Sequence, residues 1–323
     1  MFNPTTILID AFAEELASHY IDMYGEDEQD LHRIVSCAHS SLEIIANSDA
    51  PYHDMNHTMM VTSVGMEILR GKILLEGNVT NSDWVHFVIS LLNHDIGYAR
   101  GICKADRSGW YTINADMDTI APPVGATDAF LTPYHVDRGK MYIKDRFSSD
   151  VEINTDVICA NIERTRFPIP HEADDSATDD LPGLLRAADL IGQLADPHYF
   201  RKISALYAEF VETGQSAKLG YTTAADLQAA YPRFYWNVVS SYIEDGVRFL
   251  RRTQDGQAWV ANLHANVFTE EHETPCYGPE RRFDDDRRIA TGSLFTASEL
   301  TQNDQRQSSR RLQELVASEG KAD

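Results

Sequence analysis

Residues 84–97 read WVHFVISLLNHDIG, a mostly apolar run that is followed by Asn93, His94 and Asp95. Such a run without Gly or Pro favours a buried helix, and Gly97 can end that helix. A buried carboxylate is costly unless it is paired or bound to a metal, so Asp95 needs a partner. His94 and Asp95 could converge on one divalent ion, or Asp95 could simply bond backbone amides at the helix end. The stretch therefore predicts a core helix that ends in potential metal ligands.

The chain around this stretch has helical periodicity along most of its length. Period-two alternation is almost absent, so an all-α fold is predicted. Two irregular stretches, 99–126 and 167–180, have the length of loops that are usually kept for sites or lids. The apolar pattern decays after about residue 270, so residues 1–270 are expected to form the main domain and 271–323 a polar tail with a helix near 296–318. Helices of the main domain are expected near 5–24, 28–47, 51–71, 82–96, 126–147, 151–163, 180–195, 197–213, 222–230, 232–253 and 256–268.

The composition limits the compartment and the partners. The four cysteines include no CxxC pair, so neither a thiolate zinc site nor a disulfide framework is suggested, and a cytoplasmic location is expected. No apolar run is long enough to cross a bilayer, so membrane insertion is not expected. The formal net charge of −22 repels nucleic-acid polymers, which we exclude as partners. A small phosphorylated substrate is compatible with this charge, because bound cations invert the charge of a local site.

Two histidines precede the core helix, within PYHDMNH at residues 51–57. His53 and His57 are four residues apart, so a helix that begins at Pro51 would place them on one face. Two histidines on one face can act as a neutral metal ligand and a proton donor. The alternative is a pair of half-exposed histidines at a helix start.

A second acidic candidate lies within LLRAADLIGQL, residues 184–194. Asp189 is enclosed by apolar residues, which is unusual for a carboxylate unless a partner neutralises it. That partner is either Arg186, three residues earlier, or a metal, and the order His, His-Asp, Asp along the chain favours the metal. Gln193 lies one turn after Asp189, where its amide either faces the metal or caps a buried backbone group.

The order His57, His94-Asp95, Asp189 resembles the HD superfamily of metal-dependent phosphohydrolases. Tyr52-His53 with His57 is similar to the YHNxxH element of the cyclic-nucleotide phosphodiesterases in that superfamily. The resemblance covers roughly residues 30–215. It implies an HD-type helical bundle, here with extra helices and a C-terminal appendage. It also implies one or two divalent ions (Mn, Mg, Zn or Fe) held by His57, His94, Asp95 and Asp189, with Asp95 as the bridging ligand and His53 as the general acid.

The sequence departs from these families at three positions. Tyr98 stands where phosphodiesterases carry the second histidine of HDxxHPG. Asn161 and Ile162 replace the two histidines of the HHERxDGxGYP region of cyclic-di-GMP hydrolases, so a three-histidine second metal site of that kind cannot form. Cyclic-di-GMP hydrolysis is therefore not expected.

Three further residues are candidates near the substrate. His135 follows a proline and is equally consistent with a ligand, a donor to a ligand and a structural histidine. Arg164 or Arg138 could offset phosphate charge, although an Arg on a helix is more often solvated.

The expected function is metal-dependent hydrolysis of a small phosphoester, with cyclic nucleotides slightly ahead of other nucleotides. The alternatives are a di-iron oxygenase of the HD type and a non-catalytic ligand-binding module. The first alternative requires more histidines than the motifs supply, and Asn161 stands where one of them is needed. Whether the chain forms a homodimer is left open.

Overall fold

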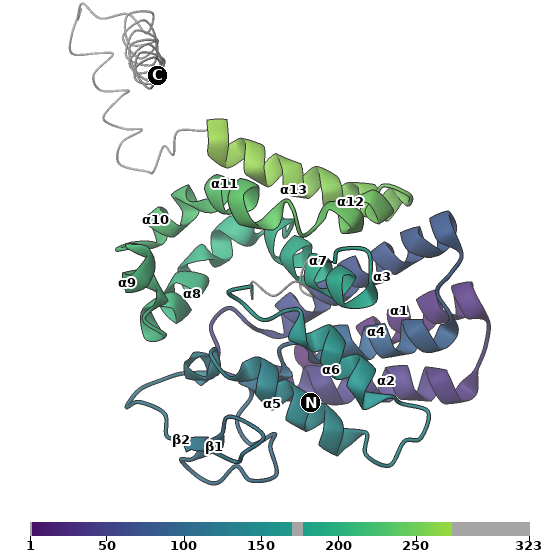
Figure 1. Cartoon of the computed structure of the whole chain (residues 1–323), viewed down its shortest axis with the longest axis horizontal. Coiled ribbons are helices and arrows are strands. Elements are labelled where there is room, and N and C mark those ends of the chain that lie inside the picture. The colour runs from purple at the N-terminus through teal and green to yellow at the C-terminus, as the bar shows by residue number, and fades with distance from the viewer. Residues whose placement is uncertain (1, 170–176, 273–323) are drawn as a thin grey trace, which may run out of the picture. The chain divides into compact units, whose positions relative to one another are not determined.

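The computed structural model describes residues 2–169 and 177–272, which form helices joined mostly by short turns (Figure 1). Within the described residues one short antiparallel hairpin is the only sheet, so the predicted all-α class is confirmed. The predicted tail helix lies outside the described residues. The elements are α1 (Pro4–Tyr24), α2 (Glu28–Ala46), α3 (Met55–Glu76), α4 (Asn81–Asn93), the 3-10 turn η1 (Ile96–Tyr98), β1 (Tyr111–Thr112), β2 (Thr119–Ile120), the 3-10 turn η2 (Asp128–Leu131), α5 (His135–Arg146), α6 (Thr155–Glu163), α7 (Leu181–Leu194), α8 (Tyr199–Glu212), α9 (Gln215–Leu219), α10 (Ala224–Ala229), α11 (Tyr231–Phe234), the π-turn η4 (Tyr235–Val239), α12 (Glu244–Leu250) and α13 (Gln254–His272).

The start of α3 differs from the prediction in a way that matters for the site. The helix begins at Met55, because the extended residue Asp54 acts as its N-cap and accepts the backbone N–H of His57 at 2.9 Å. His53 therefore lies before the helix. The prediction that His53 and His57 share one helix face is wrong.

Other predicted boundaries differ where turns interrupt the apolar pattern. The helix expected over 126–147 is divided into η2 and α5. The helix expected over 232–253 is divided into three elements, which are α11, η4 and α12. The loop at 99–126 contains the hairpin β1–β2, which pairs Tyr111 with Ile120. Neither the hairpin nor α9 was expected, because each is too short to produce a periodic signal.

The pair α3 and α7 forms the centre of the core, and α4 and α12 pack against both helices. Figure 1 shows α8 to α11 on one side of this centre and α1 with α2 on the other. The two central helices approach closely because Gly192 faces Val61: a Cβ at Gly192 would lie 2.8 Å from the Val61 Cα. Within the described part of the chain, no helix has both the length and the apolar character needed to span a membrane.

We expect Gly192→Ala to destabilise the protein by about 1–3 kcal/mol, because the added methyl forces α3 and α7 apart. Gly139→Ala, in α5, is the matched control, since its Cβ would make an ordinary 3.6 Å contact with the Ile96 Cγ2. Removing a helical glycine without a clash is neutral or stabilising by about 0.5–1 kcal/mol. Urea unfolding of both variants checks the prediction, and equal midpoints for the two would contradict it.

Candidate metal centre

Four side chains from three helices and one turn meet in the core. His57 lies in the first turn of α3, His94 directly follows α4, Asp95 precedes η1, and Asp189 lies in α7. Ligand atoms of His57, His94 and Asp189 lie within 4.8 Å of one another. The Asp95 Oδ2 is 3.3 Å from the His57 Nε2 and 3.1 Å from the His94 Nε2. The structure thus brings together all four residues that the sequence predicted as ligands.

The backbone fixes which nitrogen of His94 faces this cluster. His94 caps the C-terminus of α4, and its Nδ1 donates to the Leu91 carbonyl at 2.7 Å. That bond leaves the Nε2 toward the cluster, where it lies 3.4 Å from the His57 Nε2. A backbone carbonyl that accepts from the Nδ1–H sets the tautomer that a metal-binding histidine needs.

The cluster has the chemistry of a metal site. The buried Asp95 Oδ2 has no partner with good hydrogen-bond geometry among the described residues, and its neighbours are the Nε2 atoms of His57 and His94. A buried carboxylate oxygen in such a place is costly unless a cation neutralises it. Two imidazole nitrogens and two carboxylates are a donor set that suits a divalent metal. Arg186, the other candidate partner of Asp189, places its guanidinium 4.7 Å from the centre of the Tyr242 ring. The buried cluster could therefore hold a metal ion.

In the metal-free cluster the carboxylates hold protons on the imidazoles. Burial lowers the pKa of His57, but Asp189 and Asp95 outweigh it and raise the pKa to about 9. Burial is likewise outweighed at His94, where Asp95 and Asp189 raise the pKa to about 9. Burial raises the pKa of the Asp95 carboxyl, and the neighbouring His94 and His53 hold it well below its usual range. A metal ion would take the place of these protons.

His53 is held at the edge of the cluster by Glu209 of α8, a residue that the sequence analysis missed. The His53 Nδ1 lies 2.6 Å from the Glu209 Oε2, and the Glu209 Oε1 accepts the backbone N–H groups of Tyr52 at 2.7 Å and His53 at 3.2 Å. Burial lowers the pKa of His53, but the charge of Glu209, followed by that of Asp95, raises it overall. Glu209 is three residues after Leu206 on the buried face of an amphipathic helix, which was the available signal.

Tyr98 separates His53 from His135. The Tyr98 ring stacks on His53 at a centroid distance of 4.5 Å and on His135 at 4.6 Å. The His135 Nδ1 donates to the Thr132 carbonyl at 2.6 Å, and its Nε2 lies 3.7 Å from the Asp95 Oδ1. The two oxygens of Asp95 therefore face different histidines: Oδ2 faces His57 and His94, and Oδ1 faces His135.

The remaining predicted residues surround the cluster at different distances. Tyr52 is buried, and its ring centre lies 5.5 Å from that of His57. Gln193 is half-buried and hydrogen-bonds the Tyr199 hydroxyl. The Asn161 Nδ2 donates to Ser90, one turn before His94, at 3.0 Å. Arg164 is directed toward Asp180, with 3.7 Å between its Nη2 and the Asp180 Oδ2.

Arg138 was a candidate to bind phosphate, but the structure commits its guanidinium to other groups of the protein. It is fully buried, and all five of its N–H groups bond to carbonyls or to Asp106. The prediction that Arg138 offsets phosphate charge or is solvated is wrong. Its partners lie in η1 and in the segment that follows it.

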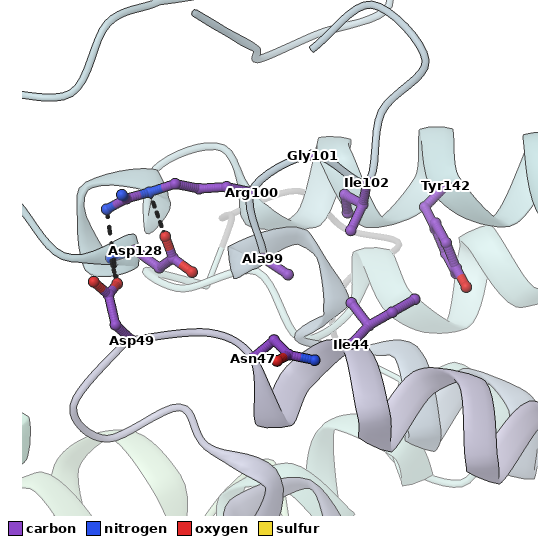
Figure 2. Close-up of a pocket in the computed structure, with 9 residues that line it drawn as sticks. All are labelled: Ile44, Asn47, Asp49, Ala99, Arg100, Gly101, Ile102, Asp128 and Tyr142. Atoms are coloured by element: carbon purple, nitrogen blue, oxygen red, sulfur yellow. Dashed lines mark hydrogen bonds and ion pairs between the residues drawn. The ribbon is translucent and has the colours of Figure 1, made fainter. Parts of the chain in front are cut away.

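A pocket of about 490 Å³ opens beside this segment, between the end of α2 and α5. Figure 2 shows Arg100 crossing one wall to Asp128, with Asp49 beside it, while Ile44 and Tyr142 line the opposite wall. The Arg100 Nε lies 2.5 Å from the Asp128 Oδ1. The lining residues include none of the proposed metal ligands, so this pocket is separate from the cluster.

Comparison with known proteins places the whole cluster inside one family. The chain matches the Npun_R2479-like family over residues 2–273. It belongs to the Npun_R2479-like family. No curated protein matches the chain. The Npun_R2479-like region includes every proposed ligand as well as His53, His135 and Glu209.

We expect Asp95→Asn to abolish metal loading, because it removes the charge that faces all three histidine nitrogens. Exposed His264 in α13 is the matched control, and His264→Ala should keep the wild-type metal content. Elemental analysis of the purified variants measures both. Equal metal content in wild type and Asp95→Asn would refute the assignment.

Metal affinity should depend steeply on pH. With pKa values of about 9, His57 and His94 are protonated in the metal-free protein at neutral pH, and a metal must displace those protons. The apparent affinity should therefore rise as the pH increases and level off above about 9. Titration calorimetry in buffers of different ionisation enthalpy would measure the released protons, and binding without proton release at pH 7 would contradict the prediction.

Proposed function

We propose that this chain is a metal-dependent phosphohydrolase that cleaves a phosphoester of a small substrate, with a cyclic nucleotide or another nucleotide as the favoured class. The observation that carries the proposal is a histidine paired with a carboxylate beside a cluster of residues that could hold a metal ion. His53 is paired with Glu209 at 2.6 Å and its ring centre lies 5.5 Å from that of His57. Motif order along the chain, His57, His94-Asp95 and Asp189, supports the same reaction class by its resemblance to HD phosphohydrolases.

The residues that would hold a first divalent ion are His57, His94, Asp95 and Asp189. The Asp95 Oδ1 and the His135 Nε2, 3.7 Å apart, are the donors available to a second ion. Imidazole with carboxylate suits Zn, Fe and Mn, and Mg is compatible with the carboxylates. A bound ion supplies a nucleophile by lowering the pKa of water.

His53 supplies the proton that the departing group needs. Its Nδ1 is engaged by Glu209, so the Nε2 is the nitrogen that can reach a substrate. In hydrolysis the attacking water oxygen forms the new bond to phosphorus, the ester P–O bond breaks, and the His53 proton passes to the departing oxygen. Before this transfer, Glu209 stabilises the imidazolium of His53 and fixes the orientation of its ring. The charge of Glu209 raises the pKa of His53, which favours the protonated form that a proton donor needs.

Exposure indicates the side from which a substrate approaches. The side chains of His53 and Asp189 are 20% and 21% exposed, whereas that of His94 is fully buried. The substrate therefore meets the cluster at the edge formed by His53 and Asp189. Small phosphoesters fit this edge better than polymers, since the acidic chain repels nucleic acid.

A di-iron oxygenase is the second candidate, and the contact between Asp95 and His135 favours it. A bridging carboxylate with a further histidine is what a second iron requires. Asn161 argues against this candidate, because an amide that donates to Ser90 occupies the position where another histidine is needed. Iron content and oxygen consumption distinguish it from the hydrolase.

A non-catalytic module would bind metal and ligand without turning over either class of substrate.

The direct test is metal analysis of the purified protein, followed by a screen of phosphoesters with Mn²⁺, Mg²⁺, Zn²⁺ and Fe²⁺. We expect hydrolysis of at least one small phosphoester that disappears in Asp95→Asn. The His264→Ala variant should match the wild type. A metal-loaded protein that hydrolyses no phosphoester in the screen would exclude the proposed function.

His53→Ala should separate acid catalysis from metal binding. We expect metal content near that of the wild type and a kcat lower by about a hundredfold or more on an alkyl phosphoester, the scale of a lost general acid. A p-nitrophenyl ester should lose much less, because its phenolate departs without a proton. Equal losses on both substrates, or loss of the metal, would show that His53 is a ligand or a structural residue.

Glu209→Gln should shift the pH profile in a defined direction. The substitution removes the charge that raises the pKa of His53, so His53 loses its proton at lower pH and the alkaline limb of kcat moves to lower pH. Glu212→Gln is the matched control on the same helix, since Glu212 accepts from Thr127 instead. An unchanged alkaline limb in Glu209→Gln would separate Glu209 from the proton donor.

A further inference from the structure

Arg138 is a fully buried guanidinium in the second turn of α5 that binds the segment after the metal ligands. Its Nε donates to the Gly97 carbonyl at 2.8 Å, and its Nη2 donates to the Ala99 carbonyl at 2.9 Å. The Nη1 donates to the Thr112 carbonyl, and both terminal nitrogens reach Asp106, at 3.3 and 3.1 Å. A planar fork with five donors can make this pattern, and an ammonium group cannot.

Asp106 extends the same attachment along the backbone. Besides Arg138, its carboxylate accepts N–H groups from Gly101 at 2.9 Å, Cys103 at 3.4 Å and Thr112 at 2.8 Å. The ion pair therefore holds residues 97–112 against α5 through both of its members. The side chain of Asp106 is only 3% exposed, so its charge depends on Arg138.

Tyr98 lies between Gly97 and Ala99, whose carbonyls both accept from Arg138. Its ring in turn lies between the rings of His53 and His135. His135 is one helical turn before Arg138 on α5, so the guanidinium fixes the histidine's helix and the tyrosine's backbone together. The fit is tight: a Cβ at Gly97 would lie 1.8 Å from the His135 carbonyl oxygen.

We propose that the Arg138–Asp106 pair is a positioning device that fixes Tyr98 as the spacer between His53 and His135. The pair touches neither histidine, so it acts through the backbone of η1 and through α5. Loss of the pair would let the Tyr98 ring leave the stack and change the direction of the His135 Nε2 toward Asp95. The catalytic consequence rests on the proposed function, whereas the geometry of the stack does not.

A buried ion pair can also serve only the stability of a fold, so the test needs a comparison pair. Arg33 and Asp150 form a similar two-point contact at 3.0 and 3.3 Å, between α2 and the loop that follows α5. Neither residue contacts η1 or the histidine stack in the described contacts. Asp150→Asn is therefore the matched control for Asp106→Asn.

The experiment records the imidazole Cε1–H signals of the metal-free full-length protein by NMR. Ring currents from Tyr98 shift the His53 and His135 signals upfield, and Tyr98→Leu gives their unstacked positions. We expect Asp106→Asn and Arg138→Lys to move both signals toward the Tyr98→Leu positions, with Asp150→Asn at the wild-type positions. Arg138→Lys keeps the buried positive charge, so its His53 and His135 signals test the proposal if Asp106→Asn does not fold.

Metal titration gives the second readout. Loss of a residue that orients a ligand lowers metal affinity by about 10- to 100-fold, so Asp106→Asn should weaken a second Mn²⁺ by that amount and leave the tighter ion near its wild-type affinity. Histidine signals that stay at their wild-type positions in a folded Asp106→Asn or Arg138→Lys protein would overturn the proposal. If the protein has no phosphoesterase activity, the proposed function is wrong. The NMR comparison would still decide whether the Arg138–Asp106 pair positions Tyr98.

Discussion

The carboxylate of Asp95 is the constraint on which the arrangement of the core depends. It lies two residues after α4, whose residues from Trp84 to Asn93 are all buried, so the carboxylate is buried where that helix packs. A buried carboxylate requires cationic or metal partners, and those partners come from other elements. His57 brings α3, His94 ends α4, and His135 begins α5, each with a nitrogen within 3.7 Å of an Asp95 oxygen. The charge thus specifies which helix ends must meet.

The sequence predicted the members of the cluster because their signals are local. An apolar run that ends in His94-Asp95, and a carboxylate enclosed by apolar residues at Asp189, are both unusual enough to indicate a shared partner. Most helices were also predicted to within a few residues, since apolar periodicity over ten or more residues is specific. Where the prediction of α3 failed, a side chain competed with periodicity: Asp54 caps the helix and moves its start past His53.

The supporting residues could not be predicted because their partners are distant in the sequence. Glu209 bonds a histidine 156 residues earlier, and its place on the apolar face of α8 indicates burial but does not identify that partner. Arg138 gave the signal of an ordinary helical arginine, and its buried guanidinium bonds carbonyls of η1 and of the loop after it. Tyr98 was noticed as a departure from a motif, but its place between two histidines follows from the packing of α5 against Gly97. Such contacts are tertiary, and a single sequence carries no record of them.

The two classes of histidine in this site differ in what holds their protons. His57 and His94 are protonated because carboxylates of the cluster face them, and a metal that binds those carboxylates removes the reason for the protons. The charge that contributes most to raising the pKa of His53 is that of Glu209, which is outside the cluster. A metal ion would therefore displace the protons of the ligands, while the charge of Glu209 would still raise the pKa of His53. Under the proposed function, this separation would let one small site contain neutral ligands and a proton donor at the same pH, because Glu209 is bonded to His53.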